Sequence, residues 1–130
     1  MRKILLPVLM LSITFACSKS EDKQKKMIEE VMAVHDEVMP KMDEIMTLKG
    51  QLDSVAKVSP DSVKAKDLYV ALDSADVKMS DWMSGYNPDA VKGKSEEEVL
   101  KYYEEEKNKI VKVKELTNTS IEEAKAFLKK

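Results

Sequence analysis

Apolar side chains recur along most of the chain at alternating intervals of three and four residues, the spacing that places them on one face of an α-helix. The pattern predicts helices over about residues 21–55, 60–85 and 95–129. Strand-like alternation of apolar and polar residues is almost absent. The positions on this face, which we call the seam, are Ile28, Val31, His35, Val38, Met42, Ile45 and Leu52; Ala65, Leu68, Leu72, Ala75, Met79, Trp82 and Tyr86; and Val99, Tyr103, Ile110, Val113, Ile121, Ala124 and Phe127.

Residues that favour helix ends mark the boundaries of these segments. Ser20 is the predicted N-cap of the first helix, because a serine side chain can accept a hydrogen bond from the open N–H groups of the first turn. Ser59 followed by Pro60 predicts the N-cap and first position of the second helix. Ser95 with Glu98 three residues later has the capping-box pattern, so it predicts the start of the third.

Two places interrupt the pattern inside a predicted helix. Pro40 lies on the polar side of the first segment, where a proline removes one backbone hydrogen bond. We expect a kink there rather than the end of the helix. The third segment is polar at residues 117–120, which predicts a bend or a break.

The three segments are joined by short connections, which favour antiparallel neighbours. The predicted fold class is therefore all-α, an antiparallel up-down-up three-helix bundle that occupies residues 23–130 as one domain. A long helical hairpin, partly dimeric, is the alternative that fits the same pattern.

The N-terminus has the layout of a signal peptide. Arg2 and Lys3 form a short basic start, and an uncharged run follows from Ile4 to Phe15. As a helix, that run of about 12 residues would extend about 18 Å, short of the roughly 30 Å hydrocarbon core of a membrane. The segment therefore indicates export, with residues 1–16 as a cleaved signal peptide rather than a transmembrane helix.

Thr14, Phe15, Ala16 and Cys17 resemble a lipobox, the sequence at which a lipoprotein signal peptidase cuts before a diacylated cysteine. The resemblance implies cleavage between Ala16 and Cys17, and covalent diacylglycerol and fatty acid on Cys17. Several acyl chains hold a protein on a membrane, whereas one chain binds only marginally. Cys17 is the only cysteine, so no intramolecular disulfide competes for its thiol. Ordinary secretion of a soluble periplasmic protein is the alternative.

The residues after this cysteine indicate a destination. Ser18, where an aspartate would signal retention, resembles the sorting signal for the outer membrane. Residues 19–22 resemble the short charged tract that sends some lipoproteins to the cell surface. We therefore expect residues 17–22 to be a lipidated tether, and the protein to be an outer membrane lipoprotein on the periplasmic or cell-surface face.

Charge and composition exclude several classes of function. Without residues 1–16 the chain keeps 20 basic and 24 acidic side chains, a net charge of −4. Nucleic acids and anionic lipid surfaces attract clustered lysine and arginine, so neither is an expected partner. One histidine and one cysteine supply neither a nucleophile with its base nor a full metal-activated site, so we expect no enzyme and no catalytic residue. Acidic residues opposite the seam, such as Glu30 and Glu37, are expected to form a solvated face with ordinary pKa values.

Methionine is dense around the only histidine, with five of the nine methionines between residues 27 and 46. A turn near residue 58 would bring His35 level with Trp82 in an antiparallel hairpin. Thioethers and imidazole suit Cu(I), which makes this layer a candidate metal site. The alternative is that methionine fills irregular gaps in a helical core and that Trp82 packs as its largest side chain. The candidate Cu(I) set is His35, Met39, Met79 and Met83, with Trp82 beside the metal.

Residues 35–42, which read HDEVMPKM, and the segment around Met79 to Met83 resemble small bacterial lipoproteins that are often labelled viral A-type inclusion protein. The resemblance covers most of the chain. It implies a helical lipoprotein and brings no established activity. We therefore expect a non-enzymatic envelope lipoprotein, anchored through Cys17, whose helical module contacts an envelope protein partner through an apolar patch beside the seam. Cu(I) binding is the alternative function.

Overall fold

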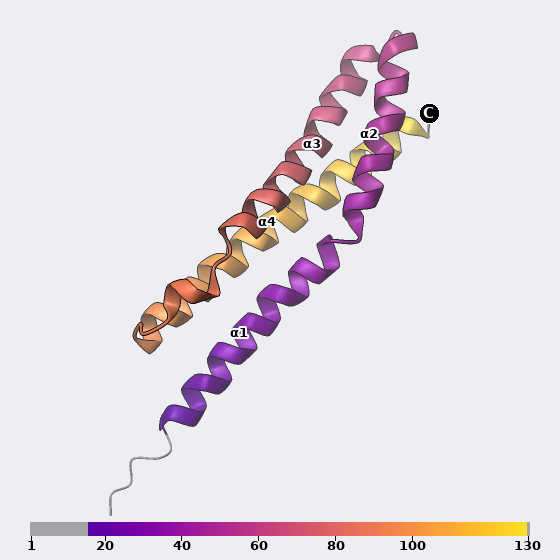
Figure 1. Ribbon diagram of the computed structural model, residues 1–130. Helices are drawn as coiled ribbons and strands as arrows, with labels where there is room; N and C mark the ends of the chain where they lie inside the picture. Colours follow the sequence, from indigo (N-terminus) through magenta and orange to yellow (C-terminus); the bar gives the residue numbers. More distant parts are fainter. Residues whose placement is uncertain (1–15, 130) are drawn as a thin grey trace, which may run out of the picture.

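The computed structural model describes residues 16–129, and this part of the chain is helical with no strand. It contains four α-helices and one short 3₁₀-helix, which pack as a helical bundle (Figure 1). The prediction of an all-α bundle is thereby confirmed. The predicted signal peptide lies outside the described residues, apart from Ala16. The elements are α1 (Ala16–Val38), α2 (Lys41–Val58), α3 (Ser62–Gly85), η1 (Pro88–Val91) and α4 (Glu96–Leu128).

The first predicted helix is two helices. α1 ends at Val38 and α2 begins at Lys41, with Met39 and Pro40 in a turn between them. Pro40 has no N–H to donate, and in a continuous helix its ring would clash with the carbonyl four residues earlier. The α-helical hydrogen bonds therefore do not continue through this residue. The expectation of a kink within one continuous helix was therefore wrong.

Helix starts agree with the sequence at one of the three predicted positions. The described part of α1 begins at Ala16, so Ser20 lies inside the helix and is not its N-cap. Asp61 is the N-cap of α3, two residues after the predicted Ser59, whose Oγ instead accepts a hydrogen bond from the Asp61 N–H at 3.1 Å. The capping box at the start of α4 is confirmed, because Ser95 Oγ accepts from the Glu98 N–H and the Glu98 carboxylate accepts from the Ser95 N–H.

α4 is continuous through its polar middle, contrary to the predicted bend or break. Thr117 and Ser120 are buried there at 0% and 3% exposure. Ser120 Oγ donates a hydrogen bond to the carbonyl of Ala71 at 3.3 Å, which ties α4 to α3. Both side chains are small enough to pack at a helix interface, so their polarity interrupts neither the helix nor the core.

The core consists of three hydrophobic clusters that follow one another along the molecule. One joins α2, α3 and the last part of α4 around Leu52 and Leu72, and the next joins α1, α3 and α4 around Val38 and Trp82. The third joins η1, α1 and the start of α4 around Tyr103. All three lie within residues 27–128, so a chain that starts at residue 17 contains these three clusters.

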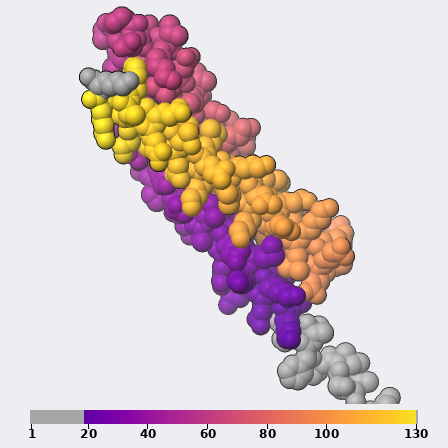
Figure 2. Space-filling model, turned by 180° about the vertical axis from the view of Figure 1, so that it is seen from behind, coloured from indigo at the N-terminus to yellow at the C-terminus, as the bar shows by residue number. Residues whose placement is uncertain are grey.

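The helices build a long, narrow molecule (Figure 1). α4 extends along its length, with α1 beside the first part of α4 and the pair α2–α3 beside the second part. Seen from behind, α4 lies on the visible face and extends from the end that holds the start of α1 to the end formed by α2 and α3 (Figure 2). Within the described residues, the apolar stretches of the helices are too short or too charged to span a membrane.

Candidate functional site

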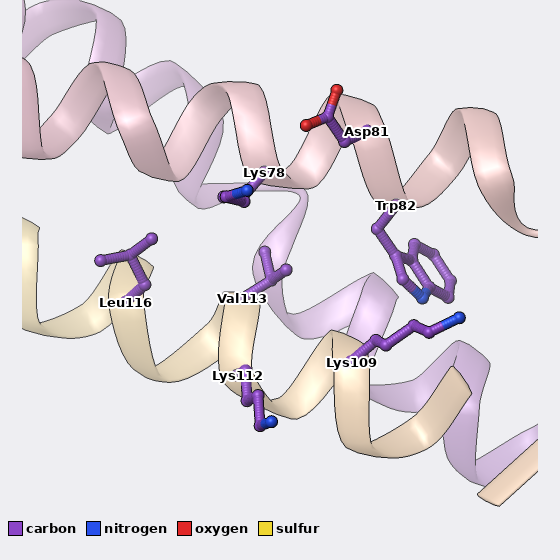
Figure 3. Close-up of a pocket in the computed structure, with 7 residues that line it drawn as sticks. All are labelled: Lys78, Asp81, Trp82, Lys109, Lys112, Val113 and Leu116. Carbon is purple, nitrogen blue, oxygen red and sulfur yellow. The ribbon is translucent and has the colours of Figure 1, made fainter. Parts of the chain in front are cut away.

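A groove of about 470 Å³ lies between α3 and α4 (Figure 3). This volume falls in the range of about 300–1,000 Å³ in which small-molecule sites are found. The walls are mainly apolar, and charged side chains surround the opening. The groove is lined by Lys78, Asp81 and Trp82 from α3 and by Lys109, Lys112, Val113 and Leu116 from α4.

Trp82 forms the aromatic wall of the groove and is only 7% exposed. Its indole is directed from α3 toward α4, where Lys109 passes beneath the ring (Figure 3). Behind it, the Tyr86 ring stacks on the indole at a centroid separation of 5.0 Å, and the His35 ring lies 5.8 Å away at a tilt of 37°. The packing of α1 against α3 and α4 therefore fixes the orientation of this wall.

The indole Nε1 of Trp82 is buried and has no hydrogen-bond partner among the described residues. Buried tryptophan N–H groups usually find an acceptor, because leaving a donor unpaired away from water costs free energy. A donor of this kind in the wall of a groove is a site where a ligand oxygen would restore a missing hydrogen bond.

The rim of the groove carries more positive than negative charge. Lys78, Lys109 and Lys112 contribute three ammonium groups, whereas Asp81 contributes one carboxylate that points away from α4 (Figure 3). Lys109 Nζ also donates to the Glu106 carboxylate at 2.6 Å, and this hydrogen bond raises the pKa of Lys109 above its usual range. Counting both carboxylates, the groove has a surplus of one positive charge in a chain whose net charge is −2.

Glu106 is a buried carboxylate, 3% exposed, that sequence reasoning missed. It lies three residues after Tyr103 and four before Ile110, so it continues the seam spacing. Burial, together with Tyr103 and other neighbours that include Glu106, raises the pKa of Tyr86 to about 12. The phenol therefore stays neutral and serves as a packing surface for Trp82.

Among the predicted Cu(I) residues, the structure shows contacts of Trp82 with His35 and places Met79 in the same core cluster as Trp82. The ring contact between His35 and Trp82 agrees with the predicted level of the two residues. Met79 is 1% exposed in the same core cluster as Trp82, whereas Met39 and Met83 are 36% and 42% exposed. Within residues 16–129, no three His, Cys, Asp or Glu side chains are grouped so as to hold a metal ion.

The acidic residues of α1 do not form a purely solvated face. Glu30 pairs with Lys107 at 2.6 Å and Glu37 pairs with Lys114 at 2.7 Å, and these hydrogen bonds lower the pKa of each carboxyl below its usual range. The expectation of ordinary pKa values was therefore wrong for these two glutamates. Their seven-residue spacing was the signal in the sequence, because it places them on one edge of the helix.

Cys17, the predicted lipidation residue, and Ala16, on the other side of the predicted cleavage point, are the first two residues of the described α1. The start of α1 lies at the end of the molecule where the start of α4 also lies (Figure 1). The groove is farther along α4, beginning at Lys109, which is 13 residues after the first residue of that helix. At roughly 1.5 Å per residue, Lys109 lies about 20 Å from the first residue of α4 along the helix axis.

Comparisons with protein-family models, with curated proteins and with solved structures find no match for this chain. Its function is therefore inferred from its own residues and their geometry.

Proposed function

We propose that this protein is a non-enzymatic lipoprotein of the bacterial cell envelope, anchored through Cys17, whose helical bundle is a binding module. The observation that carries the binding role is the groove between α3 and α4, which has a basic rim and an apolar wall that includes Trp82, whose buried Nε1 has no partner among the described residues. The anchoring role is supported by the signal-peptide layout and by the lipobox resemblance that ends at the only cysteine.

The bundle topology that we propose is up-down-up, with α1 and α2 as the first arm. Ion pairs support it. Glu30 pairs with Lys107, Glu37 with Lys114 and Glu44 with Lys125. The residue numbers therefore rise in the same direction along α1–α2 and along α4. That order is expected when the first and last arms are parallel and α3 returns between them.

Exposed apolar side chains offer a further contact surface. Val63, Val70 and Val77 are seven residues apart on α3, and their exposed fractions are 71%, 64% and 48%. Residues at this spacing share one face of a helix. This row lies on the face of α3 opposite the seam, because Val70 is two residues, or about 200° round the helix, from both Leu68 and Leu72. We propose that an envelope protein partner covers this row. The proposed location is the outer membrane, on its periplasmic or cell-surface side.

The anchor is tested by growing cells that express the full-length protein with a radiolabelled fatty acid. The wild type should carry the label and fractionate with the outer membrane, because acylation depends on the thiol of Cys17. Cys17→Ser should carry no label, because serine has no thiol to acylate. Ser18→Ala is the matched control, and it should be labelled like the wild type. Equal labelling of Cys17→Ser would refute the anchor, whereas secretion of an unlabelled wild type would favour ordinary cleavage and release.

Cu(I) binding by His35 and the methionines stays a prediction. The His35–Trp82 contact is compatible with it. Its thioethers lie in different environments, because Met39 and Met83 are exposed whereas Met79 is buried in the core.

A further inference from the structure

The groove between α3 and α4 combines three features that no other part of the described molecule brings together. It has apolar walls that include Trp82 and Val113, an indole N–H without an acceptor, and a rim with surplus positive charge. Each feature constrains a ligand independently. Together they specify its body, one of its polar contacts and its charge.

The apolar walls specify the body of the ligand. Val113 is 7% exposed and Trp82 is equally buried, so the deep part of the groove offers carbon surface and the lysine stems extend it outward. Covering such surface with a hydrocarbon chain removes it from water, which favours binding of an apolar ligand body. The stretch from Lys109 to Leu116 covers about two turns of α4, or roughly 10 Å, which suits one short chain. A helical peptide ligand presents anchors over several turns and needs a longer groove.

The charged groups specify the head of the ligand. Three lysines face two carboxylates, Asp81 and the Lys109-bound Glu106, so the uncompensated charge is a single positive one. One anionic charge balances it. The unpartnered Trp82 Nε1 requires an acceptor oxygen, which a carboxylate supplies and an ammonium head cannot.

We propose that the groove binds a single-chain fatty acid, with its hydrocarbon chain against Trp82, Val113 and Leu116 and its carboxylate between the indole N–H and the lysines of the rim. This inference deepens the proposed binding role by naming the ligand class of that site, and it does not depend on the lipid anchor. Loss of fatty-acid binding would leave the outcome of the Cys17 labelling experiment unchanged, so the two proposals fail separately.

The test uses a Cys17→Ser protein that starts at residue 17 and therefore contains all three hydrophobic clusters. Trp82 is the only tryptophan, so its fluorescence reports the groove directly. Titration with dodecanoate should change this fluorescence with saturation at one equivalent, and calorimetry should give the same stoichiometry. Bound dodecanoate should also raise the melting temperature, because it binds the folded state. Acetate, which has the head without the chain, and dodecyltrimethylammonium, which has the chain with the opposite charge, should not compete.

Charge variants separate the groove from general adsorption. Lys78→Gln combined with Lys112→Gln should weaken dodecanoate binding by roughly 2- to 30-fold, the effect of removing two exposed charge interactions. Lys109 is kept, because removing it would leave the buried Glu106 without its partner. Lys92→Gln combined with Lys101→Gln is the matched control, since both lysines are about three-quarters exposed and lie outside the groove lining.

Removing the indole donor provides a second, independent readout. Trp82→Phe keeps an aromatic wall but has no N–H, so calorimetry should show weaker dodecanoate binding with little loss of thermal stability. The proposal is overturned if dodecyltrimethylammonium binds as well as dodecanoate, if the groove and control lysine variants bind equally, or if binding does not saturate. Absence of any dodecanoate binding, with an acidic protein captured at the groove instead, would also overturn it.

Discussion

Thr117 is a fully buried residue of α4 whose hydroxyl has no hydrogen-bond partner among the described residues. A hydroxyl removed from water without a partner costs the folded state its lost hydration. Thr117 lies four residues after Val113 and four before Ile121, so it continues the seam spacing, and an apolar side chain of the same shape would meet the same neighbours. Polarity at this residue therefore lowers stability, and no described contact compensates for it.

Replacing Thr117 by valine should raise the free energy of unfolding by about 1–3 kcal/mol, because valine keeps the branched shape and removes the unpaired hydroxyl. Urea unfolding followed by circular dichroism measures the change. Thr119→Val is the matched control, since Thr119 is exposed on the same helix and should change stability little. A stability loss in Thr117→Val would show that the hydroxyl has a partner in solution.

Among individual residues, the apolar members of the core could be predicted from the sequence, whereas the buried charged ones could not. Val31, Ile45 and Leu72 lie on the predicted seam and are 0% exposed. Lys49 interrupts the seam in the sequence, but its side chain is only 12% exposed and its Nζ lies 2.5 Å from the Asp73 carboxylate. Glu106 is buried in the same way beside Lys109. Hydrophobic spacing treats such positions as gaps, because it takes no account of the charged partner that permits burial.

Among the helices, α1 is connected to the rest of the molecule differently from the others. It packs mainly against α4, and two ion pairs, Glu30–Lys107 and Glu37–Lys114, join the two helices. The break at Pro40 interrupts its hydrogen-bond ladder before α2 begins. α1 can therefore open as a local unit while α2, α3 and the last part of α4 keep their own cluster.

Reversing the two charges tests this independence. Glu30→Lys with Glu37→Lys would oppose lysine to Lys107 and Lys114, so amide hydrogen exchange should become faster in α1 and stay unchanged in α2 and α3. Adding Lys107→Glu and Lys114→Glu should restore slow exchange in α1. Asp22→Lys with Glu29→Lys changes the same charge on exposed positions of α1 and should have little effect. Uniform acceleration in all helices would show that the bundle opens only as a whole.

At the element scale, the existence of the helices could be predicted more reliably than their ends or their mutual register. The helix over residues 95–129 was predicted within one residue of α4, because a capping box marks its start. The division at Pro40 depended on whether packing could hold one bent helix, which hydrophobic spacing does not reveal. The groove also escaped prediction. Lys78 and Lys112 meet across α3 and α4 only in one register of those helices, and the sequence does not specify that register.

The whole molecule depends on carboxylates that are ionised at neutral pH. Hydrogen bonds from Lys107 and Lys114 lower the pKa of Glu30 and Glu37, and the N–H and hydroxyl of Ser95 lower that of Glu98. A carboxyl whose pKa is lower in the folded state contributes stability above its unfolded pKa and loses that contribution as the pH falls through the folded value. Acid should therefore destabilise the bundle.

Stability measured by urea unfolding should be constant from about pH 7 to about pH 5.5 and should fall as the pH drops below the ordinary glutamate value of 4.5. Glu30→Gln with Glu37→Gln should be less stable at neutral pH and should lose less on acidification, so its profile is flatter. Glu29→Gln, at an exposed position beside them, should keep the wild-type profile. Stability that rises on acidification would contradict the lowered pKa values.

The exposure of individual methionines determines how the protein would respond to oxidants. Met46 is 61% exposed and Met83 is 42% exposed, so conversion of either thioether to a sulfoxide adds a polar group where solvent already lies. Met79 is 1% exposed in the cluster around Trp82, where a sulfoxide would have no room and no partner. Surface methionines can thus react first, sparing the interior thioether on which the aromatic wall depends.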